Sequence, residues 1–388
     1  MDLQEPVFTL DDVLWERLLE LTGGEAALCF QCGTCTATCP WGLVRGETVS
    51  VREFIRRVQL GLEATEALWL CTTCAQCEAY CPRGVSIASI FRALREIAWE
   101  RRETPEGLPS LLWSLYWNDN TWSQPPSQRA QWAKDLAIPV FDPQQHEILL
   151  YVGGAASFDN RVQKVAAALV KVLRAAEVAF GILGADEPPS GADVLDVGHR
   201  PFFEELAAKT AAVFRERGVK RLIALSPHSY DAFKNHYPFV SESFTPQHYV
   251  QYLAELLELG RLKPLLSLEA TVAFHDPCYL ARHNEELTAP RRVLAALPGV
   301  ALVEMVHSGA DTLCCGGGGG RMYLETAAGE RFSDVRVEEA QAALAPTVGT
   351  PIMVTACPYC IVCLEDSVKA RKMALTVKDI AEIVALTI

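Results

Sequence analysis

Five cysteines near the C-terminal end of the chain stand in three short groups that could bind one metal centre together. They are the single Cys278, the adjacent pair Cys314 and Cys315, and the two cysteines of the segment Cys357-Pro358-Tyr359-Cys360. A closed structural zinc site takes four ligands, so five thiolates exceed what one zinc ion needs. Soft thiolates in this number favour iron–sulfur chemistry instead.

Eight further cysteines form two copies of one spacing near the N-terminus. Residues 29–40 and 71–82 both read C-x2-C-x2-C-x3-C-P, the run of bacterial ferredoxins that carry two clusters. Three thiolates at every third position fit three corners of one cubane, and the fourth points into the neighbouring cubane. The spacing therefore predicts two [4Fe-4S] clusters. One is expected on Cys29, Cys32, Cys35 and Cys81, and the other on Cys71, Cys74, Cys77 and Cys39.

Two other uses of these cysteines fit the sequence less well. Zinc ribbons separate two C-x2-C pairs, whereas here three cysteines follow one another at the same spacing. A disulfide framework belongs to secreted chains, and the acidic start Met1-Asp2-Leu3-Gln4-Glu5 lacks the basic and apolar segments of a signal peptide. We therefore expect a cytoplasmic protein whose reduced thiols bind metal.

The C-terminal cysteine pattern resembles the cysteine-rich CCG domain of heterodisulfide reductase catalytic subunits. Related domains occur in the iron–sulfur subunits of glycolate oxidase and glycerol-3-phosphate dehydrogenase, and in iron–sulfur proteins that work beside electron-transfer flavoproteins. The resemblance implies one noncubane iron–sulfur cluster that can bind substrate sulfur. Cys363 lies outside the motif and receives no ligand role from it. The implied ligands are Cys278, Cys314, Cys315, Cys357 and Cys360.

The segments around the two ferredoxin motifs have helical periodicity. Residues 8–22 carry apolar side chains at helical spacing behind a cap at Thr9 or Asp11. Residues 49–70 read as helix, turn and helix, and residues 85–102 continue helically. These helical insertions resemble the α-helical ferredoxin domain of succinate dehydrogenase and heterodisulfide reductase subunits. We expect residues 1–102 to form such a domain.

Residues 103–146 differ in composition from the segments on either side. Prolines interrupt regular structure, while tryptophans need burial. We therefore expect an ordered connector clamped between domains, with a partner-binding surface as the alternative. The segment holds Pro105, Pro109, Pro125, Pro126, Pro139 and Pro143 together with Trp113, Trp117, Trp122 and Trp132.

Strands and helices alternate from residue 147 onward, which predicts βαβ units with a mainly parallel sheet. The order occurs twice, so we expect two Rossmann-like α/β CCG domains, residues 147–265 and 266–388, related by an internal pseudo-repeat. The expected strands are 148–152, 178–182, 221–225, 271–274, 301–304 and 352–355, and the expected helices are 160–176, 202–217, 291–297 and a long one through Glu338 and Leu344.

The first of these two copies has no cysteine at any ligand position. Gly153 to Pro189 spans the same 36 positions as Cys278 to Cys314, and Ser226-Pro227-His228-Ser229 stands where the second copy has residues 357–360. We therefore expect the first CCG domain to be degenerate and only one special cluster to be present. This departure puts in doubt any mechanism in which two clusters act on one disulfide.

Three histidines and an aspartate near these positions could take part in chemistry. His228 has no cysteine or carboxylate group beside it in the sequence, so we interpret it, like His199, as a structural histidine. His275 and Asp276 precede Cys278 and either support its sulfur through hydrogen bonds or form a polar pair at the end of a strand.

The five-glycine run from Gly316 to Gly320 resembles a phosphate loop only superficially. It lacks the Lys-Ser/Thr of a P-loop. We expect these glycines to bring backbone N–H groups close to cluster sulfides, because glycine has the conformational freedom to do so. Arg282, His283 and Asn284 follow the first predicted ligand and either line a substrate entrance or cover the start of a helix.

Charge and hydropathy limit the partners. The net charge of −13 disfavours a nucleic-acid backbone. No window approaches the roughly 20 apolar residues of a membrane-spanning helix, so we expect a protein without a transmembrane segment of its own, attached to a membrane only through a partner. The sequence carries no flavin or nicotinamide motif, so a flavoprotein, dehydrogenase or hydrogenase subunit would supply those groups, with a membrane cytochrome b-type subunit as a further partner.

Two functions remain open from the sequence. In the first, electrons pass through the two cubanes to the noncubane cluster, which reduces or forms a thiol/disulfide substrate, as the resemblance implies. In the second, the chain only relays electrons between a flavoprotein or dehydrogenase and a membrane quinone-reducing partner. A binding module stabilised by structural zinc ions is the weakest alternative.

Overall fold

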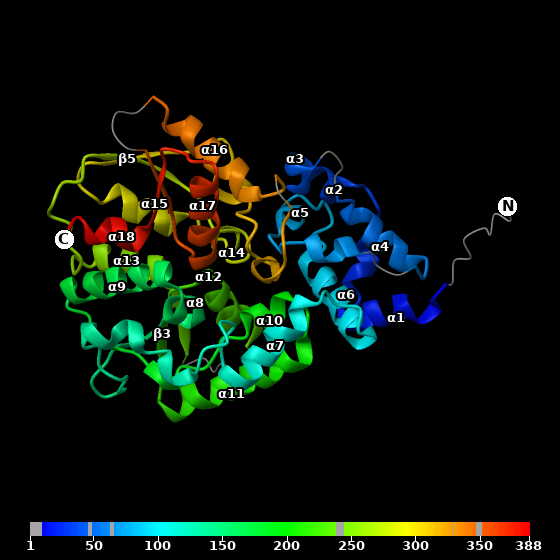
Figure 1. Ribbon diagram of the computed structural model, residues 1–388, viewed down its shortest axis with the longest axis horizontal. Coiled ribbons are helices and arrows are strands. Elements are labelled where there is room, and N and C mark those ends of the chain that lie inside the picture. Colours follow the sequence, from blue (N-terminus) through cyan, green and yellow to red (C-terminus); the bar gives the residue numbers. More distant parts are fainter. Residues whose placement is uncertain (1–9, 46–48, 63–65, 238–243, 328, 347–350) are drawn as a thin grey trace.

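The computed structural model describes residues 10–45, 49–62, 66–237, 244–327, 329–346 and 351–388. A helical region packs beside two α/β units, each built on its own sheet (Figure 1). We call residues 10–101 the helical region, residues 148–258 the first unit and residues 270–385 the second unit.

The helical region follows the predicted order of elements. Asp11 is the N-cap of the first helix, and its carboxylate accepts a hydrogen bond from the Val13 backbone N–H. Thr9, the other expected cap, lies outside the described residues. The elements are α1 (Asp12–Leu21), η1 (Glu25–Leu28), α2 (Thr34–Thr38), α3 (Trp41–Val44), α4 (Val51–Gln59), η2 (Glu66–Leu70), α5 (Gln76–Ala79) and α6 (Ile87–Arg101).

Helix α6 is buried on more than its apolar face. The expected apolar residues are inside, but Arg92, Arg95 and Glu96 are buried as well. Buried charged side chains need partners from neighbouring elements. The helix lies between the rest of the helical region and α10 (Ala192–Asp196) of the first unit (Figure 1), which supplies those partners.

The connector contains a helix that contradicts the expected burial of its tryptophans. Trp113 and Trp117 on α7 (Gly107–Asn118) are 61% and 71% exposed, because Leu108, Leu111 and Leu115 occupy the inward face. Trp122 stacks on Phe158 in the first unit, and Trp132 packs against the core. The prediction was therefore wrong for Trp113 and Trp117. Two short turns follow, η3 (Pro126–Gln128) and η4 (Gln131–Leu136).

The first unit has a four-stranded parallel sheet of order β2-β1-β3-β4. Its register aligns Leu149 with Leu222 and Arg221 with Thr245. The strands are β1 (Ile148–Tyr151), β2 (Phe180–Gly181), β3 (Arg221–Ala224) and β4 (Thr245–His248), and the main helices are α8 (Gly153–Phe158), α9 (Asn160–Ala175), α10, α11 (Arg200–Glu216), α12 (Pro227–Asp231) and α13 (Tyr249–Glu258).

The second unit has a four-stranded parallel sheet of order β6-β5-β7-β8, which is the strand order of the first sheet. The expectation of α/β architecture with parallel sheets is confirmed. The strands are β5 (Ala270–Phe274), β6 (Val300–Val303), β7 (Ile352–Thr355) and β8 (Thr376–Asp379), and the helices are α14 (Cys278–Ala281), α15 (Thr288–Ala295), α16 (Phe332–Leu344), α17 (Pro358–Ala370) and α18 (Ile380–Ala385).

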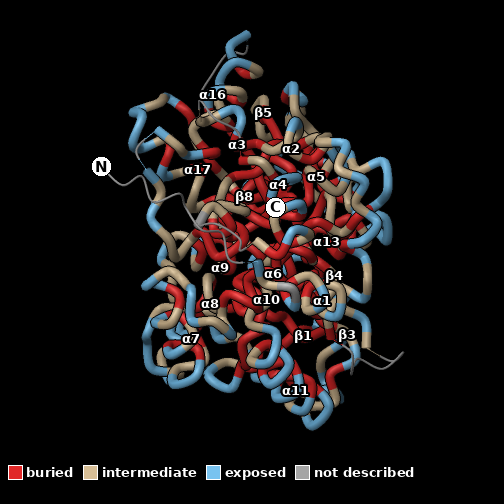
Figure 2. Tube along the Cα trace, turned by 90° about the vertical axis from the view of Figure 1, so that its right-hand side faces the viewer, coloured by how far each residue is buried: buried red, intermediate tan, exposed pale blue. Residues whose placement is uncertain are grey.

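One hydrophobic core runs through both α/β units. Buried residues of β1, α9 and α13 belong to the same cluster as those of β5, β7, α17 and α18. Figure 2 shows the buried part of the chain extending through both units. Arg161 on α9 adds an ion pair to Glu382 on α18 at 2.7 Å. The two units are therefore held together as one body.

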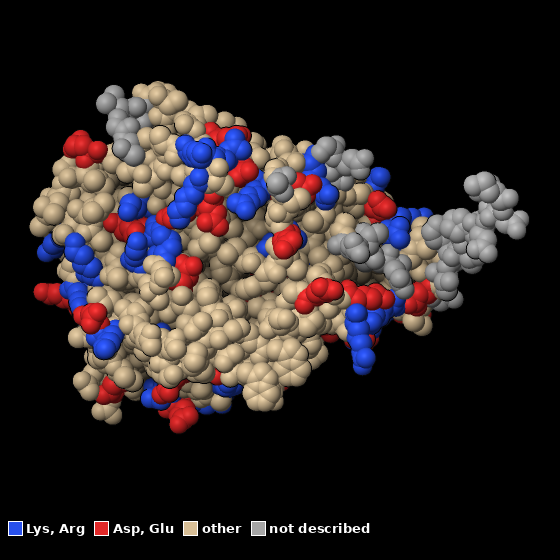
Figure 3. Space-filling model, in the orientation of Figure 1, with Lys and Arg blue, Asp and Glu red and all other residues tan. Residues whose placement is uncertain are grey.

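The surface shows no large area of one charge on the face that Figure 3 displays. Basic and acidic side chains alternate there, and few charged side chains lie over α7. Among the described residues, the structure contains no helix with the length and apolar character needed to cross a lipid bilayer.

Candidate iron–sulfur centres

Two cavities in the helical region each gather four of the predicted thiols. One, which we call the outer cavity, is lined by Cys29, Cys32, Cys35 and Cys81. The other, the inner cavity, is lined by Cys39, Cys71, Cys74 and Cys77. The structure therefore brings together the same two sets of four cysteines that the spacing predicts. In each set, three cysteines come from one motif and the fourth comes from the other motif.

Left-handed backbone conformations bend each motif around its cavity. Gln31 and Gly33 have φ of 65° and 88° in the first motif, and Thr73 and Ala75 have φ of 51° and 58° in the second. Such bends expose backbone N–H groups, and the Thr73 N–H donates to Cys71 Sγ at 3.4 Å. Donors aimed at sulfur stabilise its charged form.

The two cavities differ in their contact with water. Cys32 is exposed, and hydrogen bonds from Thr34 lower its pKa. In the inner cavity, burial raises the pKa of Cys39 to about 12 and that of Cys71 to about 11. These inner thiols are neutral without a metal, so binding of a cluster must release their protons. The chemistry of the donor set fits a soft metal centre, because all four side chains are thiols.

The other five predicted thiols meet at the carboxyl ends of strands β5 and β7. Cys278 opens the helix after β5, and Cys357 and Cys360 open the helix after β7. Neighbouring parallel strands end at the same edge of a sheet, which is the usual place of a ligand site in α/β folds. All five thiols are buried. Contact between neighbouring thiols raises the pKa of Cys278, beside Cys314, and burial together with contact with Cys315 and Cys357 raises the pKa of Cys360.

The five-thiol site also touches the inner cavity. Cys74, which lines the inner cavity, shares a hydrogen bond with Cys314, and this bond raises the pKa of Cys74. The two sites therefore meet through one pair of thiols. Thirteen cysteines fall into three sets in this way, while their role as ligands stays a prediction.

Family comparisons agree with this division of the chain. Residues 25–85 match the family described as "4Fe-4S dicluster domain". Residues 272–365 match the CCG family, described as "Cysteine-rich domain". The chain therefore carries a 4Fe-4S dicluster domain and a CCG domain. The resemblance stated from the sequence is thereby confirmed, and we refer to the five-thiol site as the CCG site.

Several curated relatives are named as oxidoreductases. The chain is 36% identical over 334 residues to the probable iron-sulfur-binding oxidoreductase FadF of Bacillus subtilis, covering 83% of this chain and 47% of that protein. It is 33% identical over 335 residues to the EtfAB:quinone oxidoreductase of Syntrophomonas wolfei, covering 82% and 46%. The chain thus spans about half the length of these two relatives.

A third relative matches along most of its own length. It is one of the subunits of the dihydromethanophenazine:CoB–CoM heterodisulfide reductase of Methanosarcina barkeri, and it is 27% identical over 394 residues, which is 93% of each chain. These three relatives are named as oxidoreductases or as a subunit of one, so they support the expected iron–sulfur oxidoreductase role.

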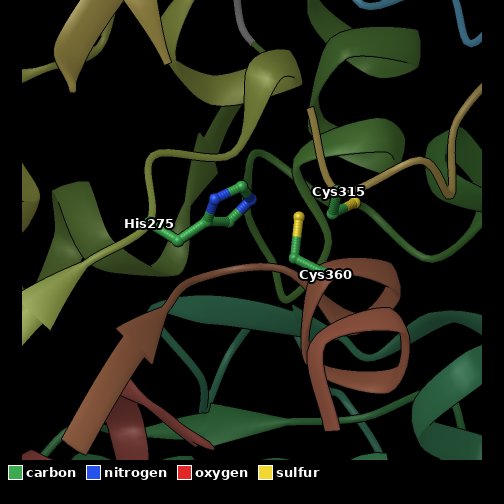
Figure 4. Close-up of side chains that lie close together, drawn as sticks. All are labelled: His275, Cys315 and Cys360. Carbon is green, nitrogen blue, oxygen red and sulfur yellow. The ribbon is translucent and has the colours of Figure 1, made fainter. Parts of the chain in front are cut away.

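His275 points its ring at the CCG site. Figure 4 shows this ring close to Cys315 and Cys360, and their ligand atoms all lie within 4.8 Å of each other. The ring is fully buried, and Nε2 has no hydrogen-bond partner among the described residues. An orphaned polar atom aimed at a thiol cluster fits a site built for an additional group.

The partner of the other ring nitrogen decides what His275 can offer. Arg336 Nε donates to His275 Nδ1 at 3.2 Å, so Nδ1 carries no proton. Burial, followed by the charges of Arg336 and Arg282, lowers the pKa of His275 and keeps the ring neutral. A neutral imidazole then carries its proton on Nε2. Although its distances would suit a metal ligand, His275 faces the CCG site with an N–H donor.

His228 reaches the CCG site from the first unit. It lies at the start of α12, is 6% exposed, and is close enough to Cys357 for that thiol to affect its pKa. Burial alone lowers its pKa, but the hydrogen bonds to Asp196 and Cys357 outweigh burial and raise it to about 10. The sequence interpretation as a structural histidine missed the contact with Cys357, because that contact crosses between two units and leaves no local signal.

The glycine run contacts both a thiol of the CCG site and the backbone of the helical region. The Gly316 N–H donates to the thiol sulfur of Cys314 at 3.2 Å, while the expected approach of N–H groups to cluster sulfides stays a prediction. At Gly318 and Gly319, however, an added Cβ would lie 2.5 Å from Thr72 O and 2.3 Å from Cys71 O. These glycines let the loop of residues 314–320, which we call the CCG loop, lie directly against the backbone of the second ferredoxin motif.

Arg282, His283 and Asn284 line none of the described cavities, so the expectation of a substrate entrance receives no support from the structure. Arg282 Nε donates to Cys74 O at 2.6 Å, and His283 Nε2 to Thr73 O at 2.7 Å. Asn284 donates to Tyr279 O. The first two side chains join the second unit to the inner cavity.

A surface cavity leads to the CCG site. Its lining includes Cys315 and Gly316 of the CCG loop, the guanidinium-bearing Arg321, and Cys363 on α17. Cys363, which has no role in the motif, lies beside Met322, with 3.5 Å between their sulfur atoms. Among the described residues, this is the cavity that brings a CCG thiol towards solvent.

The positions that lack cysteine in the first unit also meet around a cavity. Its lining includes Gly153, Pro189, Ser190, Ser226 and Ser229, which stand at the five expected ligand positions. The hydroxyl groups of Ser229 and Ser190 hydrogen-bond to each other at 3.0 Å. The first unit therefore retains the shape of a site without any thiol in it.

Proposed function

We propose that this chain is an electron-transferring oxidoreductase in which three iron–sulfur clusters connect a redox partner to a thiol or disulfide substrate at the CCG site. The observation that carries this proposal is the contact between Cys74 and Cys314, because it joins the inner cavity to the CCG site. The outer set would hold one [4Fe-4S] cluster, the inner set another, and the five CCG thiols one noncubane cluster.

The domain division expected from the sequence is part of this proposal. Residues 1–102 would form the dicluster domain, 103–146 the connector, 147–265 the degenerate CCG domain and 266–388 the intact one. The common strand order of the two sheets supports an origin of both α/β units from one repeated unit.

The accessibility of the three sites suggests an order of transfer. Cys32 and the neighbouring Phe30, which is 58% exposed, present the outer site to a partner. The inner site is more buried, and it touches the CCG site. When bound, the clusters would supply one-electron transfer, which no side chain of this chain provides. A flavoprotein, dehydrogenase or hydrogenase subunit is the expected partner at the outer site.

The cavity over Cys315 supports a sulfur substrate. Reduction of one disulfide consumes two electrons and two protons and yields two thiols, and the reverse reaction releases them. Arg321 would attract an anionic group of the substrate to the cavity. His275, with its N–H towards Cys315 and Cys360, would stabilise negative charge on sulfur.

A second function is favoured by the names of the two relatives of higher identity. One is an EtfAB:quinone oxidoreductase, and all five CCG thiols of the present chain are buried. The chain would then relay electrons between an electron-transfer flavoprotein and a membrane quinone-reducing partner, without binding a sulfur substrate.

Electron paramagnetic resonance of the anaerobically purified, oxidised protein separates the two functions. Added thiol should change the signal of the CCG cluster and leave the cubane signals as they were, if the site handles sulfur. If no thiol or disulfide changes any cluster signal, the first function is wrong. The relay would then be tested by reduction of the clusters with a reduced electron-transfer flavoprotein.

A further inference from the structure

We propose that the rim of the outer site is the docking surface for an acidic electron-transfer protein, with Arg52 and Arg83 as its charged contacts and Phe30 as its apolar contact. The proposal rests on the outer [4Fe-4S] cluster of the proposed function. It names the surface chemistry of the partner, and it applies equally to a CCG site that handles sulfur and to a pure electron relay.

Two arginines lie at the outer cavity. Arg52 on α4 and Arg83, two residues after Cys81, are both exposed, and both line the cavity. Among the described residues of this lining, no carboxylate accompanies them. The guanidinium of Arg52 lies over the first ferredoxin motif, since a Cβ added to Gly33 would be 3.4 Å from Arg52 Nη1. The positive charge of this rim contrasts with the net charge of −13 of the whole chain.

The structure of the chain itself does not explain these two arginines. No ion pair with a carboxylate in the described part of the chain neutralises Arg52 or Arg83, and the neighbouring Glu53 pairs with Arg57 at 3.8 Å. Arg52 also lies in the first turn of α4, where the helix dipole disfavours a cation. Helix stability therefore does not account for an arginine at this position, whereas recognition of an anionic surface does.

Exposed apolar side chains accompany the two charges. Phe30 lines the same cavity and is 58% exposed, and Leu28 is 44% exposed. Aromatic and arginine side chains are enriched at the centres of protein–protein contacts. Cys32, a predicted ligand of the outer cluster, is exposed at the same cavity. A partner that covers Phe30 would therefore bring its own cofactor close to this cluster.

The rim is open to a partner of protein size. Helix α4 lies on the side of the helical region that faces away from both α/β units (Figure 1), so a partner can approach without meeting either unit. An acidic partner surface would be steered towards the arginines, because complementary charge raises the rate of encounter and orients the two proteins.

An acidic protein fits this rim better than an anionic membrane does. Polybasic segments that bind anionic lipids gather about four to eight lysines and arginines. The described lining of the outer cavity contains two arginines, with an exposed aromatic ring beside them. A contact of this composition favours a protein whose cofactor exchanges electrons with the outer cluster.

The test measures how fast an acidic electron-transfer protein reduces the full chain, purified anaerobically. The probe is an acidic flavodoxin in its hydroquinone form, which gives one electron to the outer cluster and becomes the semiquinone. Stopped-flow absorbance of the semiquinone gives the rate constant at low and at high ionic strength. The variants are the double change Arg52→Gln/Arg83→Gln and the single change Phe30→Ala. Arg215→Gln is the matched control, because Arg215 is an exposed arginine on α11 in the first unit.

At low ionic strength we expect the double variant to react about tenfold more slowly with flavodoxin, the lower end of electrostatic steering effects. High salt should remove most of this difference, because salt screens exposed charges. Phe30→Ala should slow the reaction at both ionic strengths, and Arg215→Gln at neither. Reduced methyl viologen, a small cation, should reduce the double variant as fast as the wild type. An unchanged flavodoxin rate in the double variant would overturn the proposal.

Failure of the proposed function would appear differently, as a wild-type chain without two cubane signals in electron paramagnetic resonance. Isothermal titration calorimetry with oxidised flavodoxin then decides without electron transfer. Weaker binding to the double variant than to the wild type would support the docking surface. Equal or undetectable binding, or arginines that matter only for binding to phosphatidylserine vesicles, would show that the rim does not recognise an acidic protein.

Discussion

Two buried histidine rings face sulfur at the CCG site, one from each α/β unit. His275 offers Nε2–H towards Cys315 and Cys360, while His228 lies beside Cys357. Each ring has a charged partner on its other nitrogen, Arg336 for His275 and Asp196 for His228. These partners fix how the rings are protonated, which is what tunes a metal centre from outside its ligand set.

The first prediction concerns whether His275 binds metal or hydrogen-bonds to sulfur. We expect only weak coupling of a histidine nitrogen to the CCG cluster in electron–nuclear double resonance of ¹⁵N-histidine-labelled protein, because the proton on Nε2 prevents coordination. His275→Gln should retain the cluster, while His275→Leu leaves Arg336 without its acceptor and should lower the CCG iron content.

The Arg336→Met variant is the companion experiment. Without the donor from Arg336, the ring can place its proton on Nδ1 and turn a lone pair towards the site. Strong nitrogen coupling should then appear in the variant alone. Strong coupling already present in the wild type would show that His275 is a ligand and would refute the tautomer assignment.

The two cubane ligand sets could be predicted from the sequence because most ligands of each set follow one another at a fixed spacing in one short loop. The same reasoning could not find the partners of His228. Asp196 and Cys357 lie 32 and 129 residues away along the chain, and only the folded structure brings them to the ring. His275 was noticed through its position next to Cys278, but its tautomer depends on Arg336, 61 residues away.

At the scale of elements, the glycine run joins two domains through their backbones. Gly319 has φ of +63°, and a Cβ there would lie 2.3 Å from Cys71 O and 2.9 Å from Thr72 Cα. Backbone atoms cannot rotate away as a flexible side chain can. The side chain of Arg95 completes the contact by donating to Cys71 O at 2.6 Å and to Gly319 O at 3.1 Å.

The second prediction uses this close approach. Gly319→Ala should lower the stability of the protein by about 1–3 kcal/mol beyond the backbone strain, as overpacking typically does. Gly329→Ala is the control, because Gly329 also has positive φ, +82°, but has no atom within 4 Å of its Cβ position. Thermal unfolding of both variants under anaerobic conditions measures the difference, and equal melting temperatures would argue against a tight backbone contact.

Two strands that were missed from the sequence share a physical reason. Strands β4 and β8 lie at the sheet edges, and the residues of β4, Thr245-Pro246-Gln247-His248, are not an apolar run. An edge strand pairs on one side only, so it tolerates polar residues and proline. The central strands β1 and β3 were predicted to within one residue, because burial on both faces requires continuous apolar sequence.

At the scale of the whole molecule, the three sites follow one another from an exposed end to a buried one. The outer site is exposed at Cys32, the inner site touches the CCG site through Cys74, and a cavity over Cys315 brings the CCG site towards solvent. Arg92 and Arg95 on α6 bind both the first unit and the neighbours of the inner site. The fold therefore holds the three sites in a fixed sequence.

The third prediction follows from this order. Cys77→Ser removes an inner ligand that does not touch the CCG site. Reduction of the CCG cluster by dithionite-reduced ferredoxin, a donor too large for the cavity over Cys315, should slow by at least about tenfold, the effect of about 1.4 kcal/mol in the barrier. Freeze-quench electron paramagnetic resonance measures this rate. Cys363→Ser should not change it, and an equally fast Cys77→Ser variant would contradict the proposed order.

The central claim is that five thiols at the ends of β5 and β7 hold a third cluster, and iron analysis of anaerobically purified protein tests it most directly. The wild type should contain clearly more than about eight irons per chain, the content of two cubanes. Cys360→Ser should fall to about eight with both cubane signals intact. A wild type with eight irons or fewer, or with zinc in the CCG site, would contradict the account.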